Sequence, residues 1–153
     1  MSIKASTGYS ELILGPNSFE GIFDGGCIRV FSGSRPANAD AAETGVLLGQ
    51  FTNQGGSWTP THTVYGLHFE RTGKYVVNPA TELWKMRAST TGIAAWFRLV
   101  ARGDSGDVTY TEARIDGDIG LVGVDAELQL PSVNIQSGVT YPLDAFILTI
   151  PPI

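Results

Sequence analysis

The segment that decides the fold is Gly92–Arg102, GIAAWFRLVAR, in which apolar residues occupy alternate positions twice over. In an extended chain successive side chains point to opposite faces. Phe97 and Leu99 therefore share one face, and Trp96 and Val100 share the other. A strand that is largely apolar on both faces is typical of the centre of a sheet that is covered on both sides. We therefore predict a central β-strand here.

Shorter segments of the same kind surround this strand, and turn residues separate them. The further predicted strands are Cys27–Ser32, Val46–Thr52, Thr63–Glu70, Lys74–Val77, Glu82–Ala88, Ala126–Gln136 and Val139–Ile150. Pro131 predicts that its segment lies at a sheet edge or forms two short strands. Asp116-Gly117 is typical of a type I′ turn and predicts a hairpin within Ala113–Gly123. We therefore predict an all-β fold, an antiparallel β-sandwich with a jelly-roll-like arrangement as a variant.

The N-terminal residues 1–26 predict an arm with short helical turns. Tyr9–Leu14 has the composition of a first turn, which Gly15-Pro16 would end, because the residue before a proline disfavours the helical region. Asn17 or Ser18 would cap a second turn that reaches Phe23. The remaining residues 27–153 form one β-sandwich domain in this prediction, since 153 residues is the size of a single domain.

Composition limits the classes of function. The net charge of −5 and the pI of about 4.8 argue against a nucleic-acid partner, which requires clustered Lys and Arg. The sequence shows neither a signal peptide nor a stretch of about 18 apolar residues that would span a membrane. Charged residues make up only 16% and hydrophobic residues 42%. This balance favours a surface partly covered by another protein, the alternative being a Gly- and Thr-rich β domain.

The motifs that suggest chemistry are short, and each has a simpler explanation. GDSGD at Gly103–Asp107 resembles the surroundings of a serine nucleophile, but neither His62 nor His68 lies in the context of a catalytic base. These histidines are too far apart along a strand to share one zinc ion. The aspartates that would bind calcium also suit turns; they are Asp104, Asp107, Asp116 and Asp118. We expect no enzymatic activity, cofactor or metal, and we expect Cys27 to be buried and inert.

Two loops favour an interaction surface. The Ser32–Gly45 connection is longer than about 12 residues, and such loops are usually functional or disordered. We expect these segments to become ordered only against neighbouring subunits, where their backbone groups find partners. Trp58 in the Asn53–His62 loop has two explanations, an interface anchor or packing within its own loop. The predicted interface residues are Arg35, Pro36, Asn38, Asp40, Trp58, Thr59 and Pro60.

Several motifs together resemble a type of small tailed-bacteriophage structural protein. Its members carry an N-terminal STG segment, DGG-IRIYSG-PP-ADAA-TG-LL, G-A-WFRLVA-GD and R-DG-IG--GADL-L, and end in an apolar strand and Pro. The matching segments of this chain are Ser6-Thr7-Gly8, Asp24–Gly33, Pro36–Leu48, Trp96–Asp104 and Arg114–Leu130. The chain departs from the pattern at Arg35 and at Val124-Asp125-Ala126-Glu127.

The resemblance implies a non-enzymatic virion component on the capsid exterior, in the neck or in the tail. We expect a capsid decoration (cement) protein that binds and stabilises the major capsid lattice on the capsid exterior. Its partners would be the major capsid protein or other virion proteins, and it would self-associate as a dimer or trimer. The alternatives are a head–tail connector, neck or tail-associated protein, or a host- or glycan-binding module that uses Trp58 and the Asp loops.

Overall fold

A computed structural model of the chain describes residues 3–73, 75–123, 126–143 and 147–149, and it confirms the all-β, sandwich-like fold with short N-terminal helices. The helices are α1 (Thr7–Leu14) and α2 (Phe19–Phe23). Their caps are as predicted: Gly15 ends α1, and the side chain of Ser18 accepts a hydrogen bond from Gly21 N at the start of α2.

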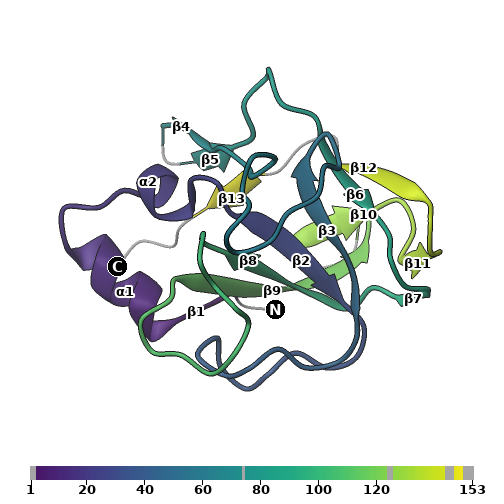
Figure 1. Cartoon of the computed structure of the whole chain (residues 1–153), viewed down its shortest axis with the longest axis horizontal. Helices are drawn as coiled ribbons and strands as arrows, with labels where there is room; N and C mark the ends of the chain where they lie inside the picture. The colour runs from purple at the N-terminus through teal and green to yellow at the C-terminus, as the bar shows by residue number, and fades with distance from the viewer. Residues whose placement is uncertain (1–2, 74, 124–125, 144–146, 150–153) are drawn as a thin grey trace.

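Most strands belong to one large sheet with the order β1-β9-β8-β2-β3-β6-β12 (Figure 1). The bounds are β1 Lys4–Ala5, β2 Cys27–Phe31, β3 Leu47–Asn53, β6 Trp84–Arg87, β8 Trp96–Val100, β9 Arg114–Leu121 and β12 Thr140–Leu143. Neighbours along this order are antiparallel, and β10 (Leu128–Leu130) adds to β9 in parallel. The predicted central strand is β8, which lies between β2 and β9 and is buried throughout.

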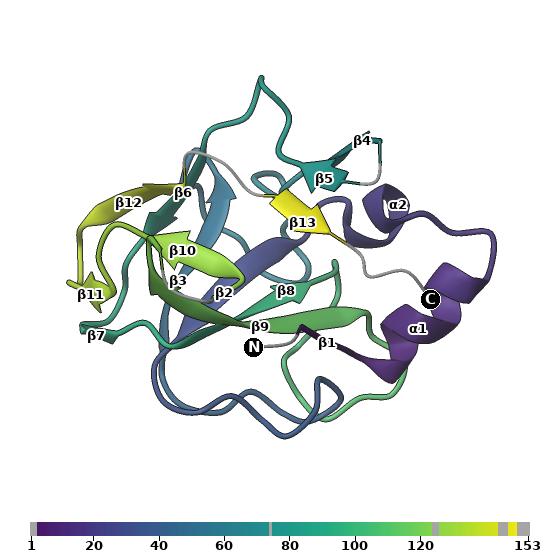
Figure 2. The same ribbon diagram turned by 180° about the vertical axis from the view of Figure 1, so that it is seen from behind.

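The small sheets lie around the large one. One joins β7 (Gly92–Ile93) to β11 (Asn134–Ile135), and the other has the order β13 (Ile147–Thr149), β5 (Tyr75–Val77) and β4 (Glu70–Thr72). Figures 1 and 2 show α2 next to this second sheet. The segment after Pro131 thus forms the predicted second short strand, β11. Residues 144–146 and 150 of the predicted C-terminal strand, and 124–125 of the departure from the phage pattern, lie outside the described residues.

One face of the large sheet, the apolar face, holds the main core. Ile28, Phe97, Leu99 and Ile115 from β2, β8 and β9 are almost completely buried there. The helices cover this core with the aromatic rings of Tyr9, Phe19 and Phe23, and the centroids of Phe19 and Phe23 are 4.8 Å apart. The N-terminal arm therefore packs on the same core as the strands.

The opposite face carries a central row of charged and polar side chains, flanked by the apolar Cys27, Phe31, Trp96 and Val100, and we call it the charged face. The register places Gln50, Arg29, Arg98, Asp116 and Lys4 side by side in one row across β3, β2, β8, β9 and β1. Such rows arise because directly paired residues point to the same side of a sheet. The two faces of this sheet thus differ sharply in chemistry although both are covered.

Three predictions about strands were wrong. Residues 139–150 do not form one strand, because β12 belongs to the large sheet and β13 to another. Asp116-Gly117 does not form a hairpin, because β9 runs straight through it and neither residue has the positive φ that a type I′ turn requires. A Cβ on Gly117 would lie 2.6 Å from a ring carbon of Phe97, so close packing explains the glycine. The predicted strand 63–70 is mostly irregular, with only Glu70 in β4 and one isolated bridge from Leu67 to Gly26.

Candidate protein interface

Arg98 ties the charged face to the long loop above it. Its guanidinium donates to both carboxylate oxygens of Asp116, at 2.7 and 2.9 Å, and both side chains are essentially inaccessible. The remaining terminal nitrogen donates to the carbonyl oxygen of Ala41 at 2.8 Å. Because a guanidinium presents its donors in a fixed fork, this arrangement fixes the position of the loop as well as its distance.

Arg114 on β9 repeats the arrangement beside it. It donates to both oxygens of Asp104 at 2.7 Å, and neither side chain is exposed. Further donors reach the carbonyl oxygens of Ala39, Ala41 and Asp107 at 3.3, 3.0 and 2.6 Å. One side chain therefore holds two loops, 32–46 and 101–113, against the sheet.

The electrostatics of these pairs reflect their burial. Burial raises the pKa of Asp116, and the neighbouring guanidinium of Arg98 opposes that rise. Burial acts to lower the pKa of Arg114, but the hydrogen bonds and charge of Asp104 outweigh it and raise that pKa. Burying a charged side chain costs free energy that its oppositely charged partner offsets. Removing either partner therefore leaves an uncompensated buried charge.

Contacts between loops complete the cover over the charged face. Glu43 N donates to Gly106 O at 3.1 Å, and Thr109 N donates to Asp40 O at 3.0 Å. Gly103 N donates to Pro60 O at 3.0 Å, which joins a third segment, 54–63. We call residues 32–46, 54–63 and 101–113 together the loop layer. Its backbone groups find partners within the chain, contrary to the expectation that these segments become ordered only against neighbours.

The base of the long loop also depends on local geometry. Gly33 and Gly45 both have positive φ, and a Cβ on Gly45 would lie 1.8 Å from the carbonyl oxygen of Ser32. Above the base, Arg29 forms an ion pair with Glu43, whose Oε2 is 2.6 Å from its Nε. The loop therefore leaves and rejoins the sheet at defined points.

The predicted interface residues of the long loop differ in how far they are exposed. Arg35 lies beside Asp118, with 3.6 Å between Nε and Oδ1, and Pro36 is buried. Asn38 is exposed, and its Oδ1 accepts from the backbone N–H of Asp40. The carboxylate of Asp40 accepts from the backbone N–H and hydroxyl of Thr7, at 2.7 and 2.6 Å, and so ties the loop to α1.

Trp58 lies inside the molecule. Its side chain packs with Cys27 and Val100, only 4% of the residue is exposed, and its Nε1 donates to Gly25 O at 2.8 Å. This burial rules out an exposed interface anchor, and the indole packs on β2 and β8 rather than within its own loop. Thr59 is exposed and Pro60 is half-buried, and both lie at the outer surface of the loop layer.

The loop layer also exposes apolar side chains that the sequence prediction missed. Val46, Val108 and Tyr110 are 52%, 60% and 66% exposed. Val108 and Tyr110 flank Thr109, whose backbone joins the long loop at Asp40. The alternation of apolar and polar residues in DVTYTE, residues 107–112, was the available signal, but strand periodicity alone does not say that the segment lies outside the sheet.

The residues considered for a catalytic or metal site do not come together as such a site in the described part of the chain. The carboxylates of Asp104 and Asp116 are engaged by arginines, and no group of three His, Cys, Asp or Glu side chains there is arranged to hold a metal ion. The thiol of Cys27 is buried, and burial raises its pKa, as expected for an inert cysteine. His68 lies against Glu82, with 3.2 Å between its Nδ1 and the Glu82 carboxylate.

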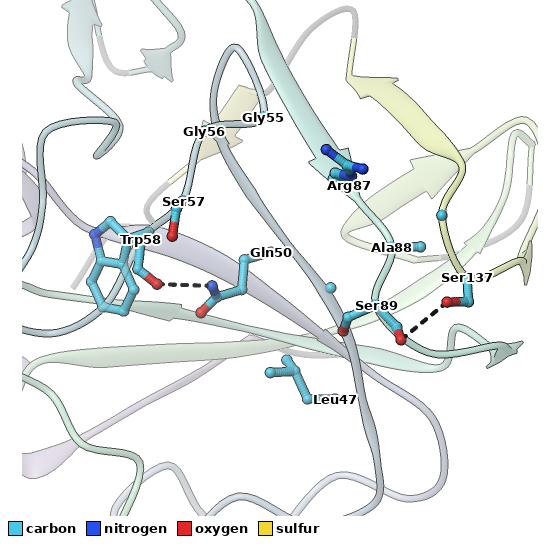
Figure 3. Close-up of a pocket in the computed structure, with 12 residues that line it drawn as sticks. Leu47, Gln50, Gly55, Gly56, Ser57, Trp58, Arg87, Ala88, Ser89 and Ser137 are labelled. Atoms are coloured by element: carbon cyan, nitrogen blue, oxygen red, sulfur yellow. Dashed lines mark hydrogen bonds between the residues drawn. The ribbon is translucent and has the colours of Figure 1, made fainter.

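An open pocket of about 510 Å³ lies where the loop layer ends, over β3 and β6, and we call it the trough (Figure 3). Gln50 forms its floor, and the Gly55–Trp58 segment, Arg87 and Ser137 line its sides. Two hydrogen bonds within the lining hold it: Gln50 Nε2 donates to Trp58 O at 3.2 Å, and Ser137 Oγ donates to Ser89 O at 3.2 Å.

Comparison with protein-family models, with curated proteins and with solved structures finds no match for this chain. Among the residues that the structure describes, neither helix approaches the length and hydrophobicity needed to cross a membrane. The function must therefore be argued from the loop layer and the trough themselves.

Proposed function

We propose that this chain is a non-enzymatic structural protein of a phage virion, and specifically a decoration protein on the exterior of the capsid. The observation that carries the proposal is the loop layer, whose position is fixed from beneath by Arg98 and Arg114. A surface that is already ordered loses less conformational entropy when it binds a rigid shell. The motif resemblance to small phage virion proteins supports the same conclusion.

The outer surface of the loop layer has the composition of a docking surface. Tyr110 and Val108 are exposed on this layer, and so are the polar residues Asn38 and Thr59. Aromatic side chains ringed by polar groups are typical of the centre of a protein interface. The partner in this proposal is the major capsid protein, and many copies on one lattice would add weak contacts into high avidity. Self-association as a dimer or trimer would increase that avidity further.

Reconstitution on tail-less capsids tests the proposal. Purified protein should co-sediment with these capsids at a stoichiometry near that of the lattice and raise their melting temperature. Tyr110→Asp should weaken this binding by about tenfold or more, since a charge in an interface centre is costly. Leu14→Asp is the matched control, because Leu14 is an exposed apolar residue on α1, outside the loop layer.

The same experiment separates the alternatives. Absence from tail-less capsids together with a few copies per complete virion would overturn the decoration proposal in favour of a neck or tail component. Calcium-dependent retention on a glycan array without capsid binding would overturn it in favour of a host-binding module. Equal loss of capsid binding in both variants would exclude the loop layer as the docking surface.

A further inference from the structure

The trough is the feature of the molecule that the loop layer does not explain. We propose that it receives an acidic side chain carried on an extended segment of the shell protein, with the carboxylate bound by Arg87. This inference rests on the proposed function and specifies the partner's chemistry at one part of the surface.

Charge is the first argument. Arg87 is the only charged residue that lines the trough, and no ion pair joins it to a carboxylate in the described part of the chain. Arg29, Arg98 and Arg114 are each paired with an acidic side chain, whereas the exposed Arg87, like Arg71 and Arg102 outside the trough, has no such pair among the described residues. In a chain of net charge −5, an arginine without an acidic partner inside a pocket is complementary to a carboxylate from outside.

The rest of the lining suits a polypeptide. Ser57 supplies a hydroxyl group to the lining, whereas the hydroxyls of Ser89 and Ser137 donate to Leu48 O and Ser89 O within the chain. A volume of about 510 Å³ exceeds what one carboxylate fills and is within the range of ligand sites. Because the amide of Gln50 is already bonded to Arg29 and to Trp58 O, the floor is ordered before any ligand arrives.

Position and sign of charge identify the occupant as a protein segment. The Gly55–Trp58 wall continues directly into Thr59 and Pro60 at the outer surface of the loop layer. A shell protein docked on the loop layer therefore has a short path into the trough. A nucleic acid is disfavoured, because the negative net charge of the chain repels a polyanion.

Charge reversal with a matched control tests this inference on tail-less capsids. We expect Arg87→Glu to weaken capsid binding by about tenfold or more, and Arg87→Lys to retain most of it. Arg71→Glu makes the same charge change at an exposed site on β4, in a separate sheet, and should leave binding within about twofold. Raising the salt from about 50 to about 200 mM should weaken wild-type binding more than that of Arg87→Gln.

A probe without capsids tests the trough separately. In NMR titrations, the peptide acetyl-Gly-Glu-Gly-amide should shift resonances of Arg87, Ser57 and Ser137, whereas acetyl-Gly-Gln-Gly-amide should not. Equal shifts with both peptides, or shifts with inorganic phosphate alone, would overturn the inference. So would wild-type affinity of a folded Arg87→Glu protein for capsids. If wild-type protein fails to bind capsids at all, the proposed function fails, and the peptide titration still decides on the trough.

Discussion

On β8, Phe97 and Leu99 point into a core of apolar side chains, whereas Arg98 between them points the other way and holds Asp116 and the carbonyl of Ala41. Burial of apolar surface is non-directional and scales with area. Ion pairs through a guanidinium fork are directional and demand one geometry. The apolar face therefore accounts for most of the stability, and the charged face determines where the loop layer lies.

Removing one partner of a buried ion pair should have the largest effect. Asp116→Ala leaves the guanidinium of Arg98 buried without its counter-charge, so we expect the free energy of unfolding to fall by about 3–5 kcal/mol. Chemical denaturation measures this change. The double variant Arg98→Met/Asp116→Leu should regain most of the loss, yet hydrogen exchange at Glu43 N and Thr109 N should be faster than in wild type. Wild-type protection at those amides would show that Arg98 does not position the loop.

An apolar truncation on the same strand provides the contrast. Leu99→Ala removes a fully buried side chain from the opposite face, and we expect a loss of about 3 kcal/mol from lost burial and the cavity left behind. Exchange at Glu43 N and Thr109 N should accelerate only as far as the lower global stability requires. Selective loosening of these amides would contradict the division of roles between the two faces.

The outer contacts of the loop layer should contribute less. Asp40→Ala removes the acceptor for the backbone N–H and hydroxyl of Thr7, both at the start of α1. We expect a loss of about 1 kcal/mol, as for other acceptors at helix N-termini. Asn38→Ala, at a neighbouring exposed position, provides a comparison within the loop, and thermal melts resolve the difference. A change of several kcal/mol for Asp40→Ala would show that the loop anchors α1 far more strongly than its exposure indicates.

The smallest expected effect is on pH dependence. Because burial raises the pKa of Asp116, the folded state takes up a proton at this carboxyl while the unfolded chain still has it ionised. Its contribution to the free energy of unfolding therefore rises as pH falls and is complete below the unfolded pKa of about 3.9. From about pH 7 to about pH 4, the stability of wild type relative to Asp116→Asn should rise. The opposite trend would mean that pairing with Arg98 outweighs burial.

Periodicity predicted the central strands of the large sheet but not the ion pairs on its charged face. β8 was identifiable because both of its faces are apolar over adjacent residues, and the strands 27–31 and 47–53 followed from local pattern. The Asp116-Gly117 dipeptide misled because its local preference for a turn is overridden by Arg98, 18 residues away. Local sequence preference contains no information about a partner that comes close only when the chain folds.

The sequence indicated which loops form the candidate interface, but not the contacts that hold them in place. Loop length indicated that residues 32–45 matter, and composition indicated an interacting surface. That Arg114 binds the carbonyls of the loop depends on side-chain directions across two strands, which a single sequence does not reveal. The burial of Trp58 likewise depends on the carbonyl of Gly25, 33 residues before it.

The pairing of β1 with β9 has a consequence for synthesis. Ser6 bonds to Arg114, a separation of 108 residues, and Lys4 aligns with Asp116. During synthesis β1 must wait until β9 has been made before its sheet partner exists, and such distant contacts slow folding. A tag fused ahead of β1 would therefore lie beside a strand pair that forms only after β9 has been made.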